Sequence, residues 1–323
     1  MGRYLIRRFL FLALVLVVTS GVTFVIFLKL PPGDPARRAT GRQTTPQTLE
    51  AARHALGLDQ PWYVQYGRFA KGLVPWPGFF LNEDVYFSYA NNIPVKTEIA
   101  KRLPITATLT IGGAILWLLM GIPIGIASAV RRGTWVDRSS MLFALIGVSA
   151  PTFFLGFVLL DLFHYRLPLF PGSGIPPGTS MVEAMIQGRF WLPWIALAVT
   201  SAAFYARMVR GNMLEAMSED YVRTARAKGL SERRVIYRHA LRASLTPVIT
   251  LLGLDVGLLL GGAILTEVVF GLPGLGMYAL QSLTSNDFPV TMGITILAAI
   301  FILVSNLIVD VVYAVLDPRV RYQ

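Results

Sequence analysis

Six apolar stretches constrain the fold of this 323-residue chain more than any other feature. They cover residues 9–30, 106–130, 141–165, 190–208, 245–270 and 292–316. The hydrocarbon core of a bilayer is about 30 Å thick, and a helix needs about 20 apolar residues to cross it. Lipid offers the backbone no hydrogen-bond partners, and no stretch shows the alternation of a barrel strand. The sequence therefore predicts an all-α, polytopic membrane protein with six transmembrane helices.

Composition agrees with a membrane protein and excludes several classes of site. The chain is 54% hydrophobic and only 15% charged, which is more apolar than a soluble core of this size requires. Its formal charge of +11 gathers at the ends of the apolar stretches rather than on one basic face, which argues against nucleic-acid binding. Cysteine is absent, so disulfides, thiolate metal sites and cysteine nucleophiles are excluded, and three histidines leave little for a metal cage.

The first stretch has to be separated from a cleavable signal peptide. Arg3, Arg7 and Arg8 precede it, as they would in a signal sequence. Its apolar run is longer than a usual signal core, and no A-x-A cleavage pattern follows. A retained membrane anchor is the favoured interpretation.

The distribution of basic residues predicts the orientation. Basic residues in short connections stay on the cytoplasmic side of the membrane. With the N-terminus inside, the inner segments hold residues 3, 7, 8, 131, 132, 138, 319, 321 and nine basic residues between 207 and 242. The two short outer connections hold only Arg166 and Arg189, and Trp191 and Trp194 stand where an outer aromatic belt would lie. Both termini are therefore expected in the cytoplasm.

Three segments are expected along the chain. Residues 1–30 form a cytoplasmic stub and the first span, residues 31–103 an external loop, and residues 104–323 the core of spans two to six. The core includes a cytoplasmic loop over about 209–244. Gly72, Pro75, Pro77, Gly78 and scattered aromatic residues indicate that the external loop folds as a small cap. We find no catalytic constellation in it.

Two spans carry small residues at four-residue spacing. These are Gly253, Gly257 and Gly261 in the fifth span and Gly121, Gly125 and Ala129 in the second. Such spacing exposes bare backbone on one helical face, where another helix approaches closely. Packing within one subunit is the favoured interpretation, and a subunit interface or a moving pore wall is the alternative. Pro123, Pro151 and Pro193 are expected to kink or begin helices.

Four carboxylates fall within the spans, where a charge is costly. Asp161 and Glu267 lie near outer ends and Asp310 near an inner end, so these three are expected to reach the interface. Asp255 lies deeper and is expected to find a partner inside the bundle. These groups form no connected chain of the kind that a proton relay uses.

The cytoplasmic loop has the pattern of two short helices joined by a turn. Ser218 is a candidate N-cap, Glu219 and Asp220 follow in the first turn, and Gly229 suits the left-handed residue that stops a helix. Ser231 and Glu232 begin the second helix. Arg234, Arg238 and Arg242 then recur every four residues and are expected on one face. This elbow, residues 218–241, either docks a protein or anchors on lipid headgroups.

Several runs resemble the peptide/nickel-type branch of ABC importer permeases. The elbow run EDYVRTARAKGL at 219–230, followed by RHALR at 238–242, is similar to the coupling loop of that branch. The general importer pattern EAA-x3-G-x9-I-x-L-P is matched more loosely, with Gly229 kept. Further runs similar to the branch are RYLIRR at 3–8, PGDP at 32–35, PTFFLG at 151–156, PGSG at 171–174, EVVFGLPGLG at 267–276, DFPV at 287–290 and DVVYAVLDPR at 310–319.

The resemblance implies a type I ABC importer permease fold in the inner membrane of a bacterial cell. It also implies a division of labour among subunits. The implied partners are a second homologous permease, two cytosolic ABC ATPase subunits, an external solute-binding protein, a peptide substrate and membrane lipid. ATP and magnesium would be used by the ATPase subunits, because the chain contains no GxxxxGK[ST] phosphate-binding loop and holds no cofactor of its own. The implied contacts with the ATPase are Tyr221, Arg223, Thr224, Ala225, Arg226, Ala227, Lys228, Gly229, His239 and Leu241.

A second candidate site lies at the outer end of the fifth span. Glu267 is expected near the C-terminal end of an outward-running helix, where the dipole disfavours negative charge. The turn that follows, with Pro273, Gly274 and Gly276, would supply backbone donors and form an external gate.

The expected function is import of oligopeptides or dipeptides by a transport subunit that is not itself an enzyme. Nickel, glutathione or another small solute of the same family is the alternative cargo. An ion-coupled secondary transporter is the rival of another class, but we see no internal repeat of the kind common in that class. An ion channel or a membrane enzyme is disfavoured, since no selectivity-filter motif, metal cluster or nucleophile and base pair is present.

The topology is testable because the chain has no native cysteine. Single cysteines at Asp84 and Gly174 should react with an impermeant thiol reagent applied outside intact cells. Cysteines at Gly229 and Gln323 should react only after permeabilisation. Labelling of position 229 from outside would overturn the predicted orientation.

Overall fold

A computed structural model describes residues 2–30, 34–40, 45–74, 80–82 and 85–316 of the chain. Every regular element within these ranges is a helix, as the sequence predicts. Some residues used in the sequence predictions lie outside the described residues, namely Pro75, Pro77, Gly78, Arg319 and Arg321.

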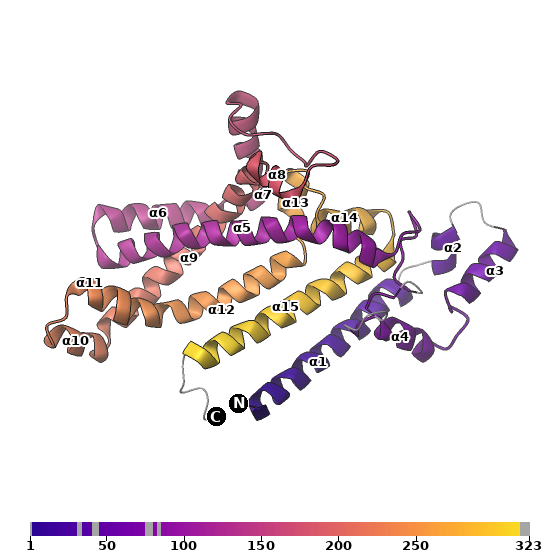
Figure 1. Cartoon of the computed structure of the whole chain (residues 1–323), viewed down its shortest axis with the longest axis horizontal. Helices are drawn as coiled ribbons and strands as arrows, with labels where there is room; N and C mark the ends of the chain where they lie inside the picture. The colour runs from indigo at the N-terminus through magenta and orange to yellow at the C-terminus, as the bar shows by residue number, and fades with distance from the viewer. Residues whose placement is uncertain (1, 31–33, 41–44, 75–79, 83–84, 317–323) are drawn as a thin grey trace. The chain divides into compact units, whose positions relative to one another are not determined.

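The chain divides into two compact units (Figure 1). Unit 1 comprises Met1–Thr106, Gly257–Ile264 and Pro273–Leu307, and unit 2 comprises Ala107–Val256, Leu265–Leu272 and Ile308–Gln323. The boundaries fall inside three long helices, α5 (Val95–Val130), α12 (Leu241–Leu260) and α15 (Phe288–Leu316). These helices therefore belong in part to each unit.

Unit 1 contains the N-terminal helix and the predicted cap. Its further helices are α1 (Gly2–Phe24) with the π-helix η1 (Val25–Lys29), α2 (Pro35–Thr40), α3 (Pro46–Ala55), α4 (Trp62–Lys71) and α14 (Leu275–Thr284). Phe24 of α1 packs on Phe69 of α4, and Phe69 packs on Tyr86. The expected cap is thus helical and packed, while its side of the membrane stays a prediction.

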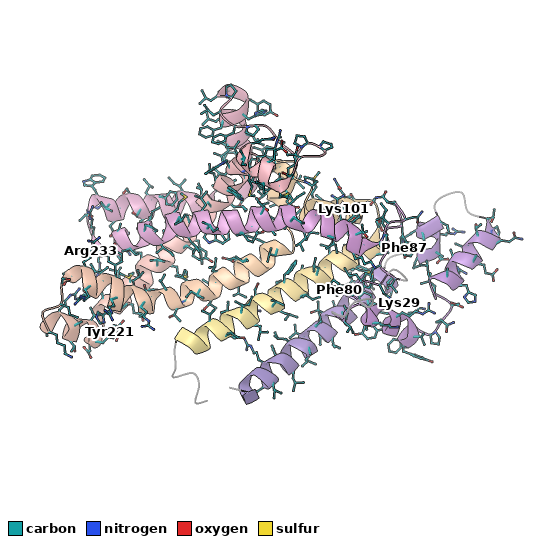
Figure 2. All side chains as sticks on the ribbon, in the orientation of Figure 1. Lys29, Phe80, Phe87, Lys101, Tyr221 and Arg233 are labelled. Carbon is teal, nitrogen blue, oxygen red and sulfur yellow. The ribbon has the colours of Figure 1, made fainter. Side chains whose placement is uncertain are left out.

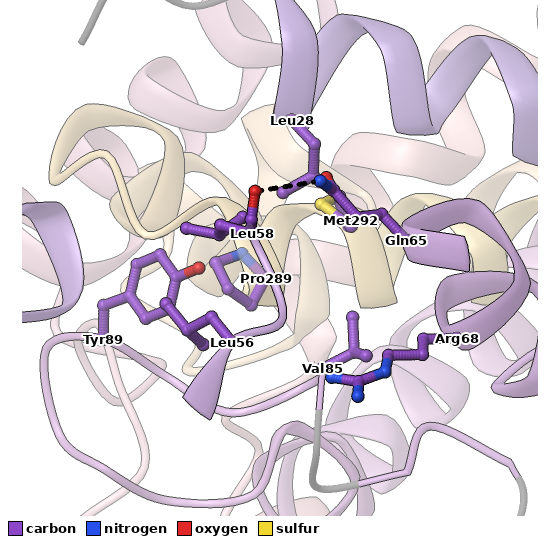
Figure 3. A pocket seen from close by; sticks show the side chains of 9 residues that line it. All are labelled: Leu28, Leu56, Leu58, Gln65, Arg68, Val85, Tyr89, Pro289 and Met292. Carbon is purple, nitrogen blue, oxygen red and sulfur yellow. Dashed lines mark hydrogen bonds between the residues drawn. The ribbon is translucent and has the colours of Figure 1, made fainter. Parts of the chain in front are cut away.

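A small pocket beside α4 shows how the cap is held (Figure 3). The Gln65 amide donates to the carbonyl oxygens of Leu58 at 3.2 Å and Gln60 at 2.7 Å, which closes the turn between α3 and α4. Its oxygen accepts a hydrogen bond from Lys29 at 2.8 Å. The Gln65 side chain therefore ties the cap to the end of η1.

Unit 2 is built around α9 (Trp191–Ser218). Its other helices are α6 (Trp135–Ser149), α7 (Thr152–Leu160), the π-helix η2 (Asp161–Arg166), α8 (Met181–Ile186), α10 (Asp220–Ala227), α11 (Glu232–Arg234) and the π-helix η3 (Val235–Ala240). Both α6 and α7 pack against α9. At its end α9 runs ten residues past the predicted boundary at 208.

The third predicted span is not one straight helix. The pair from Trp135–Ser149 to Thr152–Arg166 is bent by 98° at Ala150 and Pro151. Proline disfavours the helical region for the residue before it, and Ala150 is extended, with φ −85° and ψ 120°. The kink expected at Pro151 is confirmed, whereas the continuous helix over 141–165 is wrong.

The fifth predicted span also ends early. Its helix α12 stops at Leu260, and a separate helix α13 (Ile264–Val269) follows, so the expected helix over 245–270 is wrong. Gly262 in the break has φ +134°, and a Cβ there would lie 2.6 Å from Cα of Gly276. The break therefore rests on a backbone contact that only glycine allows.

The number of spans agrees with the prediction of six when the bent pair counts as one. Among the described residues, five helices are long and apolar enough to cross a membrane, and the bent pair makes a sixth. The five are Ile6–Lys29, Val95–Val130, Trp191–Ser218, Glu232–Leu260 and Phe288–Val312.

The glycine repeats serve packing within the chain. In unit 2, a Cβ on Gly121 would lie 3.1 Å from the carbonyl oxygen of Ala202 in α9, and one on Gly125 would lie 2.7 Å from that of Ala206. In unit 1, a Cβ on Gly257 would lie 2.8 Å from the hydroxyl of Ser305 in α15. The favoured interpretation, close packing inside one subunit, is confirmed at these positions.

The contact of Gly121 and Gly125 in α5 with the backbone of α9 is called the glycine seam. We predict that Gly125→Ala lowers the stability of the protein by disturbing this contact. The methyl group would force α5 away from α9, and overpacking of this kind costs about 1–3 kcal/mol. Gly211→Ala on α9 is the matched control, because a Cβ there meets nothing within 4 Å. The melting temperature measured in detergent should fall for Gly125→Ala only. Equal melting temperatures for both variants would contradict the close packing of α5 on α9.

Candidate functional site

The elbow begins one residue later than the sequence predicts. Ser218 is the last residue of α9, and its hydroxyl donates to the carbonyl oxygen of Glu215 at 2.7 Å. Glu219 is extended, with φ −69° and ψ 149°, and occupies the N-cap position of α10. The prediction of Ser218 as the N-cap is therefore wrong, because α9 continues as far as that residue.

The helix stop at Gly229 is confirmed. Its φ is +76°, in the left-handed region. The amide of Leu230 donates to the carbonyl oxygen of Ala225 at 3.3 Å. This hydrogen bond closes a turn of six residues, as in a Schellman motif. A Cβ on Gly229 would meet nothing within 4 Å. The position therefore needs glycine for its backbone angle and not for space.

The second half of the elbow is wound differently from the expectation. The α-helical part, α11, is three residues long, and η3 continues it to Ala240. In a π-helix the bonds join residues five apart, so a turn holds more residues than an α-helical turn. Residues four apart still lie close to one side of such a helix, and Arg238 and Arg242 line a common cleft. The expectation of one face is therefore supported for these two residues and stays a prediction for Arg234.

A small apolar core holds the two halves of the elbow together. Val222 and Val235 are fully buried, Ala225 is 5% exposed, and Leu230 packs against them. On the outside, Nε of Arg226 donates to the Glu232 carboxylate at 2.7 Å, joining α10 to α11. The elbow is thus a packed unit with its own internal contacts.

The predicted coupling residues lie mostly on the surface of this unit. Tyr221, Arg223, Thr224, Arg226, Ala227, Lys228 and Gly229 are exposed, His239 and Leu241 are half-buried, and Ala225 faces the small core. Figure 2 shows Tyr221 and Arg233 on the elbow. Partial burial, with a smaller contribution from the Glu219 carboxylate, raises the pKa of the Tyr221 hydroxyl above its ordinary value. Tyr221 therefore remains a neutral donor.

A basic cleft of about 630 Å³ opens where the elbow meets α12. Its lining brings Tyr221 and His239 together with Arg238 and Arg242, along with Ala243, Thr246 and Pro247. The prediction of coupling residues included the first two and omitted the two arginines. The four-residue spacing of these arginines could have indicated that they belong to the site. The sequence analysis used it only to place them on one face of a helix.

The deep carboxylate of unit 2 has a partner inside the bundle, as the sequence predicts. The hydroxyl of Tyr205 in α9 donates to Asp255 in α12 at 2.7 Å. Asp161 is half-exposed and pairs with Arg166 at 2.8 Å, as expected of a residue near the membrane surface. Tyr205 and Asp255 also join the two helices that flank the elbow.

The predicted gate residues fall in both units, and each part is described by itself. In unit 2, Glu267 lies in the first turn of the six-residue α13 and is fully buried, so it neither reaches the interface nor ends a long helix. The following turn is pinned by a hydrogen bond from the amide of Gly174 to the carbonyl oxygen of Phe270 at 2.8 Å.

In unit 1, Pro273 and Gly274 precede α14, and Gly274 occupies its N-cap position. A Cβ on Gly276 would lie 2.8 Å from Cα of Ile264. Among the described residues, no group of three or more histidine, aspartate or glutamate side chains forms a candidate metal site.

Comparison with protein families assigns the class of protein. Residues 121–322 match the family described as binding-protein-dependent transport system inner membrane component. Residues 1–110 match the N-terminal region of the membrane components of such systems. The chain therefore belongs to the family of binding-protein-dependent transport system inner membrane components.

Named relatives align over the whole length. The dipeptide transport system permease protein DppB of Alkalihalophilus pseudofirmus is 39% identical over 339 aligned positions, covering 99% of each chain. The glutathione transport system permease protein GsiC of Escherichia coli strain K12 is 38% identical over 323 positions, covering 100% of each. These relatives are permease subunits, so the chain is a multi-pass membrane subunit of an ABC importer and not its ATPase.

Solved structures support the fold. The inward-facing MetNI methionine ABC transporter matches with a TM-score of 0.53 and 17% identity, covering 69% of this chain and 98% of that chain. An amino acid ABC transporter with histidines matches with a TM-score of 0.50 and 19% identity, covering 69% and 94%. The chain thus has the type I importer permease fold, as the sequence resemblance implies.

Proposed function

We propose that this chain forms part of the membrane pathway through which dipeptides or oligopeptides enter a bacterial cell. The observation that carries the proposal is alignment over 99–100% of the chain with two permeases whose names give a dipeptide and glutathione as cargo. Glutathione is itself a short peptide, so both names support a cargo with a peptide backbone. Nickel remains the alternative cargo within the branch.

The proposed assembly contains a second homologous permease, two cytosolic ABC ATPase subunits and an external solute-binding protein. Membership of a binding-protein-dependent family supports the last of these. ATP and magnesium act on the ATPase subunits. The proposed orientation places both termini and the elbow in the cytoplasm and the external loop with its cap, residues 31–103, outside.

The cargo is tested on the cognate binding protein. Mass spectrometry of the ligand that co-purifies with it, followed by calorimetric titration, should identify a dipeptide, a longer peptide or glutathione. Tight binding of nickel with no response to peptides would remove the peptide assignment and leave the permease assignment intact.

The elbow, residues 218–241, is the proposed docking element for the ATPase. Its packed core and the Arg226–Glu232 bridge make it a firm projection at the end of α9. ATP binding changes the transporter only if it favours one arrangement of the subunits. A firm elbow would pass that preference to α9 and α12, the helices that flank it, as a largely rigid-body movement.

We predict that Gly229→Val uncouples transport. A β-branched residue at φ +76° carries a conformational cost of about 1–2 kcal/mol, which would tilt the second half of the elbow without altering a span. The variant should insert into the membrane, yet lose peptide uptake and either release the ATPase subunits or leave their hydrolysis unresponsive to loaded binding protein.

Gly178→Val is the matched control for that variant. Gly178 has φ +83°, and a Cβ there also meets nothing within 4 Å, but it lies far from the elbow in the sequence. Pull-down of the ATPase from detergent and uptake in cells are measured for both variants. Full uptake with stimulated hydrolysis in Gly229→Val would reduce the elbow to a lipid anchor.

Glu267, Pro273, Gly274 and Gly276 are proposed to form an external gate. The full burial of the Glu267 side chain supports a role inside the protein rather than at a lipid surface. A buried carboxylate is costly unless it is used or well paired.

We therefore predict that Glu267→Gln, which keeps the shape and removes the charge, lowers peptide uptake while the complex still assembles. Glu183→Gln is the control, since Glu183 is exposed on α8. Uptake of labelled peptide by cells with equal amounts of assembled complex is the measurement. Wild-type uptake by Glu267→Gln would remove the gate.

A further inference from the structure

A buried carboxylate at the start of α6 joins three helices of unit 2. Asp137 is 8% exposed at its side chain and accepts four hydrogen bonds. The donors are the hydroxyl of Ser128 in the last turn of α5 at 2.6 Å and the amide of Gly133 in the α5–α6 turn at 2.9 Å. The other two are Nε and Nη2 of Arg210 in α9, at 2.7 and 2.9 Å.

Asp137 and Arg210 form a two-pronged ion pair. The Arg210 guanidinium presents two donors to the two oxygens of Asp137, the forked geometry that fixes orientation as well as distance. The remaining acceptor positions face Ser128 and Gly133, so the carboxylate is paired and hydrogen-bonded at both oxygens. Removing Arg210 would leave the buried Asp137 charge without its ion-pair partner. We call Asp137 and Arg210 the clamp.

The clamp completes a block made of α5, α6 and α9. Further along, the glycine seam brings α5 against α9, and a Cβ on Gly147 of α6 would lie 3.3 Å from the carbonyl oxygen of Val199 in α9. Arg207 also donates to the carbonyl oxygen of Ala144 in α6 at 3.2 Å. Contacts therefore join the three helices over several turns, and the clamp is the charged contact among them.

Its place on α9 connects this block to the elbow. Arg210 lies eight residues before Ser218, where α9 ends, a distance of about 12 Å along a helix axis. On the other side of the elbow, the amide of Asn212 donates to the carbonyl oxygen of Ser244 in α12 at 3.3 Å. With the Tyr205–Asp255 bond, α12 is tied to α9 at two levels. The two helices that flank the elbow are therefore held to each other by hydrogen bonds.

We propose that the clamp is the positioning joint through which displacement of the elbow moves α5 and α6 together with α9. This inference rests on the proposed docking of the ATPase at the elbow. Without the clamp, α9 would shift against the α5–α6 turn, and part of the movement would be lost before it reached α5. Asp137 and Arg210 touch neither ATP nor cargo in this proposal and act through the helices they join.

The test uses the complete transporter reconstituted in liposomes. In Asp137→Asn, the ATPase subunits should stay bound and hydrolyse ATP in response to loaded binding protein. Uptake per ATP should fall at least about fivefold, the lower end of coupling between sites. Arg210→Lys keeps the charge without the fork and should give an intermediate ratio.

The matched control is Glu98→Gln in unit 1. Glu98 is 10% exposed and pairs with Lys101 at 3.1 Å and Arg102 at 3.2 Å, so it has a comparable burial and charge but is remote from the elbow in the sequence. It should lower thermal stability without changing uptake per ATP. A clamp that only stabilised the fold would behave in the same way.

A covalent rescue separates a joint from a mere stabiliser. The double variant Asp137→Cys/Arg210→Cys introduces the only thiols of this chain. Bridging them with a short bifunctional thiol reagent should restore uptake per ATP, whereas the same reagent on either single variant should not. This measurement also decides the matter if Asp137→Asn fails to accumulate.

Two results would overturn the clamp as a joint: an unchanged ratio in Asp137→Asn, or no recovery on bridging. Failure of the unaltered chain to retain the ATPase through its elbow would instead refute the docking proposal, and the pull-down distinguishes that case.

Discussion

The architecture of unit 2 depends on the closeness of α5 to α9. At Gly121 and Gly125 the backbone of α9 occupies the space that a side chain would need. In a bilayer, apolar helices gain little by leaving lipid for one another, so close van der Waals contact has to hold them. This contact brings α9 alongside the α5–α6 turn, which makes the bond between Asp137 and Arg210 possible. The polar contacts of the unit follow from the small residues.

Buried carboxylates fix positions that apolar packing leaves adjustable. Asp137 accepts from two helices and a turn, and Asp255 accepts from Tyr205. In unit 1, the buried Asp287 plays the same part by accepting from the hydroxyl of Ser88 and the amide of Tyr89. Apolar surfaces slide past one another at little cost, whereas a desolvated charge tolerates few geometries. Each carboxylate therefore sets the register of elements distant in the sequence.

The elbow and the helices beside it are built in a way that suits the proposed transmission of movement. The elbow has its own core and a glycine stop, and the helices on either side of it are braced to each other by Tyr205 and Asn212. In the proposed coupling, a small change imposed on this projection would displace whole helices, because packed helices move largely as rigid bodies. Membership of a family of binding-protein-dependent transport components fits this design.

The sequence by itself determined the features that depend on neighbouring residues. The apolar stretches became helices because lipid leaves the backbone no other partner, and Gly229 stopped a helix because glycine alone adopts positive φ without cost. The motif runs at 219–230 and 267–276 were enough to indicate the family. The partner of Asp255 was expected as a class, but Tyr205 was not identified.

Only the tertiary structure decided where helices break and which distant groups meet. The end of α12 depends on the approach of Gly276 to Gly262, and the full burial of Glu267 could not be read from its place in the sequence. Asp137 and Arg210 are 73 residues apart, and no local sequence pattern links them. Their pairing was beyond local reasoning, because the free energy of a buried ion pair depends on desolvation and geometry that packing alone supplies.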